Sequence, residues 1–141
     1  MVKVTWLGGM AFESVGATGN SFTMDATTEA GGDNRGPSPV EALIGSLAAC
    51  TGIDIISILN KKRTPPSSYR LEVHYVKETG DWPRPVTSAV VTHIIEGDVD
   101  PEAVAQAIRL SEDKYCSVSA TLKIPVQISV KGIVNETPIA P

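Results

Sequence analysis

Short alternating runs of apolar and polar residues open the chain, and they are separated by glycine-rich turns. The segments VKVTWL (2–7), AFESVG (11–16) and SFTMD (21–25) alternate only in part, but each is bounded by residues that favour turns. This pattern is typical of three strands in an antiparallel meander. The following stretch, ATTEAGGDNRGP (26–37), has almost nothing to bury and predicts a surface loop.

The longest apolar run, SPVEALIGSLAACTGIDIISILNKKR (38–63), predicts one long helix. Its apolar positions are spread too widely for a single stripe, so we expect the helix to be covered on most of its sides. Ser38 is the expected N-cap, with Pro39 at the first helical position and Glu41 three residues after the cap. Three basic residues and then TPP mark the helix end.

The second half of the chain predicts two longer strands and another helix. YRLEVHYVKE (69–78) alternates cleanly and PVTSAVVTHIIEG (85–97) less cleanly, and a turn between them indicates an antiparallel pair. DPEAVAQAIRLSEDKY (100–115) predicts an amphipathic helix with the aspartate as its cap. A short turn then leads into IPVQISVKGIV (124–134), which we expect to be the final strand.

Composition and charge narrow the class of protein. The chain has 141 residues, of which 42% are hydrophobic and 20% charged, and no internal boundary, so residues 1–141 are expected to form a single domain. The net charge is −4 and no long basic run occurs, which argues against a nucleic-acid partner. Without a signal-like N-terminus or an uninterrupted membrane-length segment, we expect a cytoplasmic protein with no membrane partner.

The two cysteines, Cys50 and Cys116, are the candidate reactive residues. They are too few for a secreted disulfide framework, so any bond between them is expected to be part of a redox cycle. A buried free cysteine usually behaves as a small hydrophobic residue. However, Ser46 and Asp54 lie one helical turn on either side of Cys50, so this face is expected to border a pocket. Cys116 follows a polar stretch and is expected to be partly exposed.

A reactive cysteine needs a nearby cation or hydrogen-bond donors. A thiol with a pKa of about 8.5 is only slightly ionised at neutral pH, and the thiolate is the nucleophile. Arg35, in the loop before the long helix, is the cation that local geometry favours, and Lys114 beside Cys116 is the second candidate. Both also fit a solvated surface charge. Capping alone explains Glu41, but this carboxylate could also orient the Arg35 guanidinium.

No cofactor and no metal are expected. His74 and His93 belong to separate predicted strands, with no other ligand at metal-binding spacing. The stretch GGDNRG (31–36) lacks the lysine and hydroxyl residue of a phosphate-binding loop.

The runs SPVEALIGSLAACTGIDIISIL and LSEDKYCSVSATL, with the order of elements around them, closely resemble the OsmC/Ohr family and in particular its YhfA-like branch. The resemblance covers nearly the whole chain. It implies an α+β fold in which antiparallel sheets pack around a long central helix and a second helix. It also implies that two subunits intertwine into a homodimer.

The resemblance further implies a thiol peroxidase that reduces organic hydroperoxides. Cys50 would attack the peroxide and become a sulfenic acid, and Cys116 would resolve it into a disulfide. An external dithiol reductant would then reduce that disulfide. Leu43, Leu47 and Ile53 are expected to line an apolar pocket for the alkyl group.

The sequence departs from the hydroperoxide reductases around the first cysteine. The family glutamate comes ten residues before that cysteine, where this chain has Val40, and Glu41 is one residue later. The family arginine would fall within TTEAGG (27–32), which has no cation, and Asp54 places a carboxylate one turn after Cys50. These differences favour an alternative, a non-catalytic protein that binds a small apolar or thiol-reactive ligand in the dimer-interface pocket and uses its cysteines as redox sensors.

Overall fold

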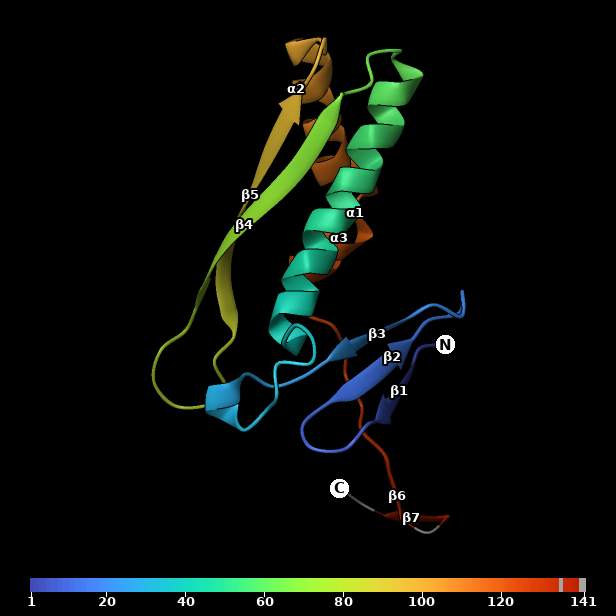
Figure 1. The fold of residues 1–141 in the computed structure, drawn as a ribbon, viewed down its shortest axis with the longest axis vertical. Helices are drawn as coiled ribbons and strands as arrows, with labels where there is room; N and C mark the ends of the chain where they lie inside the picture. The colour runs from blue at the N-terminus through green and yellow to red at the C-terminus, as the bar shows by residue number, and fades with distance from the viewer. Residues whose placement is uncertain (135, 140–141) are drawn as a thin grey trace.

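A small meander, one long helix and a long β-hairpin make up most of the molecule (Figure 1). The computed structural model describes residues 1–134 and 136–139. Its elements are, in chain order, β1 (Lys3–Trp6), β2 (Phe12–Val15), β3 (Ser21–Met24), the 3₁₀ turn η1 (Thr28–Ala30), α1 (Pro39–Lys61), β4 (Ser68–Lys77), β5 (Val86–Glu96), α2 (Pro101–Leu110), the π turn η2 (Ser111–Tyr115), α3 (Ser117–Leu122), β6 (Gly132–Val134) and β7 (Thr137–Ile139). The fold is therefore α+β with antiparallel sheets, as predicted.

The meander pairs β1 with β2 and β2 with β3, which confirms the three strands expected at the start of the chain. The loop that follows is folded back by the buried carboxylate of Asp25, which accepts hydrogen bonds from the backbone N–H groups of Asp33 and Arg35, each at 3.1 Å. Burial alone would raise the pKa of Asp25, but these N–H groups together with that of Ala26 lower it overall. A charged carboxylate thus fixes the path of the loop into α1.

Helix α1 begins at the predicted residue. The Ser38 hydroxyl accepts from the Glu41 N–H at 3.3 Å, while the Glu41 carboxylate accepts from the Ser38 N–H at 2.7 Å. This reciprocal pair satisfies two backbone donors that the first turn of a helix would otherwise leave open. Pro39 occupies the first helical position, where its missing N–H costs nothing.

The buried core lies between α1 and α2. Ile55 and Leu59 of α1 are fully buried against Ala103 and Ala107 of α2, and partly buried side chains of the β4–β5 hairpin pack around them. The hairpin is antiparallel and runs alongside the helices (Figure 1). It can approach α1 closely because Gly52 has no side chain there, and an added Cβ would lie 3.2 Å from Leu71. The alternate, more buried side chains of β4 therefore pack against α1.

The segment after Cys116 is a helix, where the sequence led us to expect a turn. Cys116 itself is the N-cap of α3, and its sulfur accepts a hydrogen bond from the Ser119 N–H at 3.3 Å. A thiol is a weak acceptor and an uncommon cap, which is why no clear start signal for this helix can be recognised from its residues.

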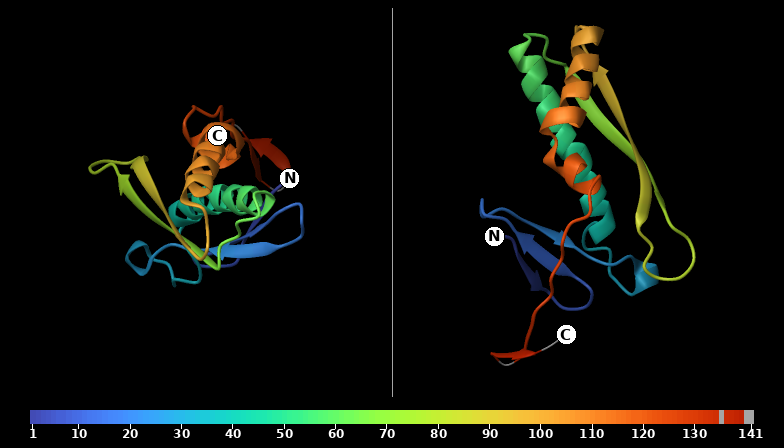
Figure 2. Two further views of the ribbon diagram at one scale, coloured as in Figure 1. Left: turned by 90° about the horizontal axis from the view of Figure 1, so that it is seen from above. Right: turned by 180° about the vertical axis from the view of Figure 1, so that it is seen from behind.

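The predicted strand over residues 124–134 is wrong except for its last three residues, which form β6 and pair with β7. Val126, Ile128 and Val130 alternate with polar residues, yet they are 56%, 80% and 69% exposed. The pattern is that of a strand, but the described part of the chain offers no strand for this segment to pair with. Figure 1 and the right-hand view of Figure 2 show the segment leading away from the helices.

Much of α1 is also left uncovered within one chain. Only 28% of its most apolar 18-residue stretch is buried, and Ile53 is 70% exposed. By length and composition alone α1 could cross a membrane, a property it shares with the core helices of many soluble proteins.

The capping box yields a stability prediction. Replacing Ser38 with Ala should lower the free energy of unfolding by about 1 kcal/mol, because the N-terminal N–H groups lose their acceptor. Urea unfolding at one fixed protein concentration measures this change. Ser57→Ala, at an exposed position in the C-terminal part of α1, is the matched control and should be nearly neutral. Equal losses in the two variants would contradict a capping role for Ser38.

Candidate redox site

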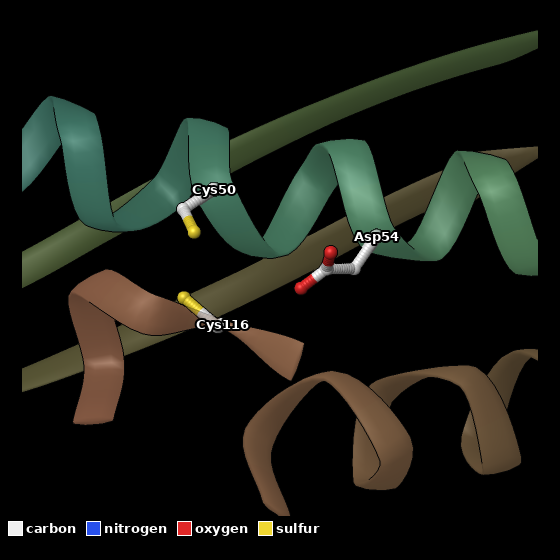
Figure 3. A group of neighbouring side chains, drawn as sticks. All are labelled: Cys50, Asp54 and Cys116. Carbon is white, nitrogen blue, oxygen red and sulfur yellow. The ribbon is translucent and has the colours of Figure 1, made fainter. Parts of the chain in front are cut away.

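Cys50 and Cys116 meet between α1 and the segment that joins η2 to α3. Their sulfur atoms and a carboxylate oxygen of Asp54 all lie within 4.8 Å of one another. Figure 3 shows the three side chains pointing into the same space. Both cysteines are free thiols in this structure. The fold thus brings together two residues that are far apart in the sequence.

The local structure explains this meeting. Cys50 and Asp54 are four residues apart on α1 and therefore share one face of the helix. Opposite them, the π turn η2 is closed by the Cys116 N–H, which donates to the Ser111 carbonyl at 2.9 Å. Ser111 is 1% exposed, and its hydroxyl donates to an Asp54 carboxylate oxygen at 2.8 Å. This hydrogen bond ties η2 to α1, and single π turns of this kind are frequent at functional sites.

The two thiols have different surroundings. Cys116 is 3% exposed, so the expectation that it would be partly exposed is wrong, whereas Cys50 is half-buried. Burial raises the pKa of the Cys116 thiol, and so does the adjacent Cys50 thiol, while the N–H groups of Ser119 and Val118 offset only part of the increase. At neutral pH Cys116 is therefore protonated, and Cys50 is the more accessible of the pair.

A pocket of about 410 Å³ lies beside the site, between α1, β5 and the segments from α2 to α3. Its lining includes, on the apolar side, Leu43, Ile44, Leu47, Ile55, Val86, Val91 and Ile108, and, on the polar side, Thr51, His93, Ser111, Glu112, Ser119 and Lys123. Leu43 and Leu47 line it as expected. Ile53 does not, because it lies on the exposed face of α1.

One polar pair reaches this pocket through His93. The Tyr69 hydroxyl oxygen lies 2.7 Å from Nδ1 of His93. Burial lowers the pKa of His93 and raises the pKa of Tyr69 to about 12. Both side chains are thus neutral at physiological pH. His93 therefore offers the pocket an uncharged hydrogen-bonding group.

A second pocket of about 340 Å³ reaches the site at Asp54. Its other lining residues include Lys61 and Lys62 from the end of α1 and Tyr115 from η2. The carboxylate therefore lies between the thiols and an opening with positive charge.

The predicted supporting residues lie elsewhere in the chain. Arg35 precedes α1, whereas Cys50 lies near its middle, roughly 16 Å along the helix axis at 1.5 Å per residue. The Glu41 carboxylate serves the capping box, and no ion pair joins it to Arg35 in the described residues. Lys114 is exposed on η2. No contact joins the side chain of Arg35, Glu41 or Lys114 to the Cys50 sulfur in the described residues of one chain. Their supporting roles therefore stay predictions.

Two members of the site were not assigned from the sequence. The spacing from Cys50 placed Asp54 on the correct face, but nothing indicated that its carboxylate would lie beside both thiols. Ser111 gave no signal at all, because a serine near the polar end of an amphipathic helix usually faces water.

The fold and the paired free thiols define an α+β protein with a dithiol site. The sequence model described as OsmC-like protein matches residues 31–131, and the chain belongs to this family. It is 33% identical over 128 residues to protein YhfA of Escherichia coli K12, an alignment that covers 90% of this chain and 92% of YhfA.

Solved structures share the same fold. A hypothetical protein from Aquifex aeolicus VF5 superposes with a TM-score of 0.75 at 27% identity, over 87% of this chain and 86% of that one. An organic hydroperoxide resistance protein OsmC from Legionella pneumophila superposes with a TM-score of 0.63 at 14% identity, over 87% and 89%. At that lower identity the likeness shows the fold alone.

The unequal surroundings of the thiols predict unequal alkylation. Iodoacetamide at pH 7 should modify Cys50 several-fold faster than Cys116, because Cys116 is buried and its pKa is raised. The rate at Cys116 should increase only above the ordinary titration range of a thiol. Peptide mass spectrometry after timed quenching measures both rates. Faster modification of Cys116 at pH 7 would show that Cys116, and not Cys50, is the more reactive thiol, which would contradict the prediction.

Proposed function

We propose that this protein is a cysteine-based peroxidase that reduces organic hydroperoxides. The observation that carries the proposal is the meeting of two free thiols, one accessible and one buried, beside a largely apolar pocket. Membership of the OsmC-like family adds support, because the Legionella protein of the same fold is named for organic hydroperoxide resistance. Two free thiols also fit the reducing cytoplasm proposed as its location.

The proposed cycle starts at Cys50. Its thiolate attacks one peroxide oxygen, the O–O bond breaks, and the alkoxide leaves and takes up a proton to give the alcohol. Cys50 is then a sulfenic acid. The Cys116 sulfur attacks the Cys50 sulfur, water leaves, and a disulfide forms. An external dithiol restores both thiols by exchange and becomes oxidised itself.

The geometry favours the resolving step. With the two sulfurs already within 4.8 Å, the disulfide needs only a small approach, since its sulfurs are about 2.05 Å apart. The leaving alcohol would occupy the 410 Å³ pocket, where Leu43 and Leu47 contact its alkyl group. Because that pocket is lined mainly by apolar side chains, alkyl and aryl hydroperoxides fit it better than hydrogen peroxide does.

Asp54 modifies this chemistry. Its negative charge opposes the thiolate at Cys50, and the hydroxyl of Ser111 withdraws part of that charge by donating to it. The carboxylate can also accept the thiol proton before attack. We propose that the cation at Cys50 that the family resemblance implies comes from a neighbouring subunit.

Peroxidase kinetics test the proposal directly. Reduced protein should consume cumene hydroperoxide at least about a hundredfold faster than free cysteine does, and faster than it consumes hydrogen peroxide. Cys50→Ser should abolish the reaction, and Cys116→Ser should leave a sulfenic acid that dimedone traps. Stopped-flow measurement with thiol counting follows each step.

The same experiment separates the alternative function. Consumption no faster than that of free cysteine would exclude the peroxidase and favour a protein that binds a small apolar or thiol-reactive ligand. The apolar pocket and the distance of Arg35 from Cys50 along α1 are the observations that favour this alternative.

We also propose that the protein acts as an intertwined homodimer. One chain leaves the face of α1 around Ile53 and the alternating segment 124–131 exposed to water. Apolar surfaces of this extent on a helix and an unpaired strand-like segment usually mark an interface. A second copy that packed against α1 and paired with the segment would cover both.

A charge placed on this face should separate the subunits. Ile53→Glu should convert a dimer into a monomer, because burying an unpaired carboxylate is strongly unfavourable. Light scattering during size-exclusion chromatography measures the mass. Gln106→Glu adds the same charge on the exposed face of α2 and should leave the dimer intact. A wild-type chain that is monomeric at micromolar concentration would contradict the proposal.

A further inference from the structure

We propose that Cys50, Asp54 and Cys116 form a binding site for a thiophilic divalent cation, for which Zn²⁺ is the best chemical match. Two sulfur atoms and one carboxylate oxygen converge within 4.8 Å of one another, from α1 on one side and the start of α3 on the other (Figure 3). Thiolates select zinc over magnesium and calcium, which prefer oxygen ligands alone.

The spacing suits a tetrahedral ion. With Zn–S bonds of about 2.3 Å and Zn–O bonds of about 2.1 Å, neighbouring donor atoms lie roughly 3.6–3.8 Å apart. Each donor atom of the trio would therefore move by less than about 1 Å to bind, a shift that side-chain rotation can supply. Three protein ligands leave the fourth position for water or an external ligand, as in many zinc sites that are not purely structural.

The surroundings already orient two of the donors. The Ser111 hydroxyl donates to Oδ2 of Asp54, which fixes the orientation of the carboxylate beside the two sulfurs. The Ser119 N–H donates to the Cys116 sulfur, which holds that sulfur in place and offsets part of the increase in its pKa that burial causes. Hydrogen bonds from outside the ligand set are the usual means by which proteins fix metal ligands. In this protein the hydrogen bonds come from Ser111 and Ser119, which are both buried.

Charge and access are also compatible with a bound cation. Two thiolates and one carboxylate carry three negative charges, so a Zn²⁺ complex keeps one, and Lys61 and Lys62 line the neighbouring pocket. That 340 Å³ pocket opens at Asp54 and gives the ion a path from solvent. Binding would release the thiol protons to the solvent, so affinity should increase with pH.

The site needs both thiols reduced and requires no peroxide chemistry. It therefore stands whether or not the proposed peroxidase activity exists. If both exist, a bound ion and a Cys50–Cys116 disulfide exclude each other, because each uses both sulfurs.

Zinc titration of the reduced protein tests the inference. Kept reduced by a phosphine rather than a thiol, the wild-type chain should bind one Zn²⁺ in competition with a chromophoric zinc indicator. Cys50→Ser and Cys116→Ser should each weaken binding by more than about 100-fold, and Asp54→Asn by at least about tenfold, since even the loss of outer hydrogen bonds costs that much. Co²⁺ should give a thiolate-to-cobalt charge-transfer band and the intense visible absorption of a tetrahedral site.

Asp113→Asn is the matched control. This exposed carboxylate lies three residues before Cys116 and outside the trio, so its loss changes the charge equally and should leave zinc affinity unchanged. Circular dichroism confirms that each variant is folded before it is titrated. Wild-type protein that binds no stoichiometric Zn²⁺, or zinc binding that survives both cysteine substitutions, would overturn the proposed site. Peroxide consumption is measured separately and does not enter this result.

Discussion

Helix α1 carries apolar side chains around most of its circumference, and the other elements are arranged so that these side chains are removed from water. Within one chain, α2 covers Ile55 and Leu59, and the β4–β5 hairpin covers the adjoining side, where Gly52 permits close approach. The remaining face of α1 stays exposed. The capping box at Ser38 and Glu41 fixes where the helix starts, and so where each face points.

The dithiol site is a local exception within this apolar packing. Cys50 and Asp54 face a polar part of the cover, the π turn and the start of α3. Asp54 is tolerated there because Ser111 satisfies one carboxylate oxygen, and the buried Cys116 sulfur is satisfied by the Ser119 N–H. The same polar contacts hold the two thiols close to each other.

The sequence predicted the elements whose signals are local. The capping box, the meander and the alternating hairpin were all predicted within a few residues, because each depends on neighbours in the chain. Three features depend on contacts between distant residues and were missed: the burial of Cys116, the hydrogen bond from Ser111 to Asp54, and the lack of pairing over residues 124–131. For that last segment the pattern did indicate a strand, but a strand also needs another strand to bond with, which no local pattern supplies.

The length of the π turn η2 restricts which sequence changes are compatible with the dithiol site. Its five residues, Ser111–Tyr115, are closed by a hydrogen bond that spans one residue more than an α-helical turn does. Removing one residue would restore α-helical phase and rotate Cys116 by about 100° around the axis, away from α1. The distance between the thiols is therefore set by the length of this segment as much as by its composition. Substitutions on its exposed side are compatible with the site, whereas insertions and deletions are not.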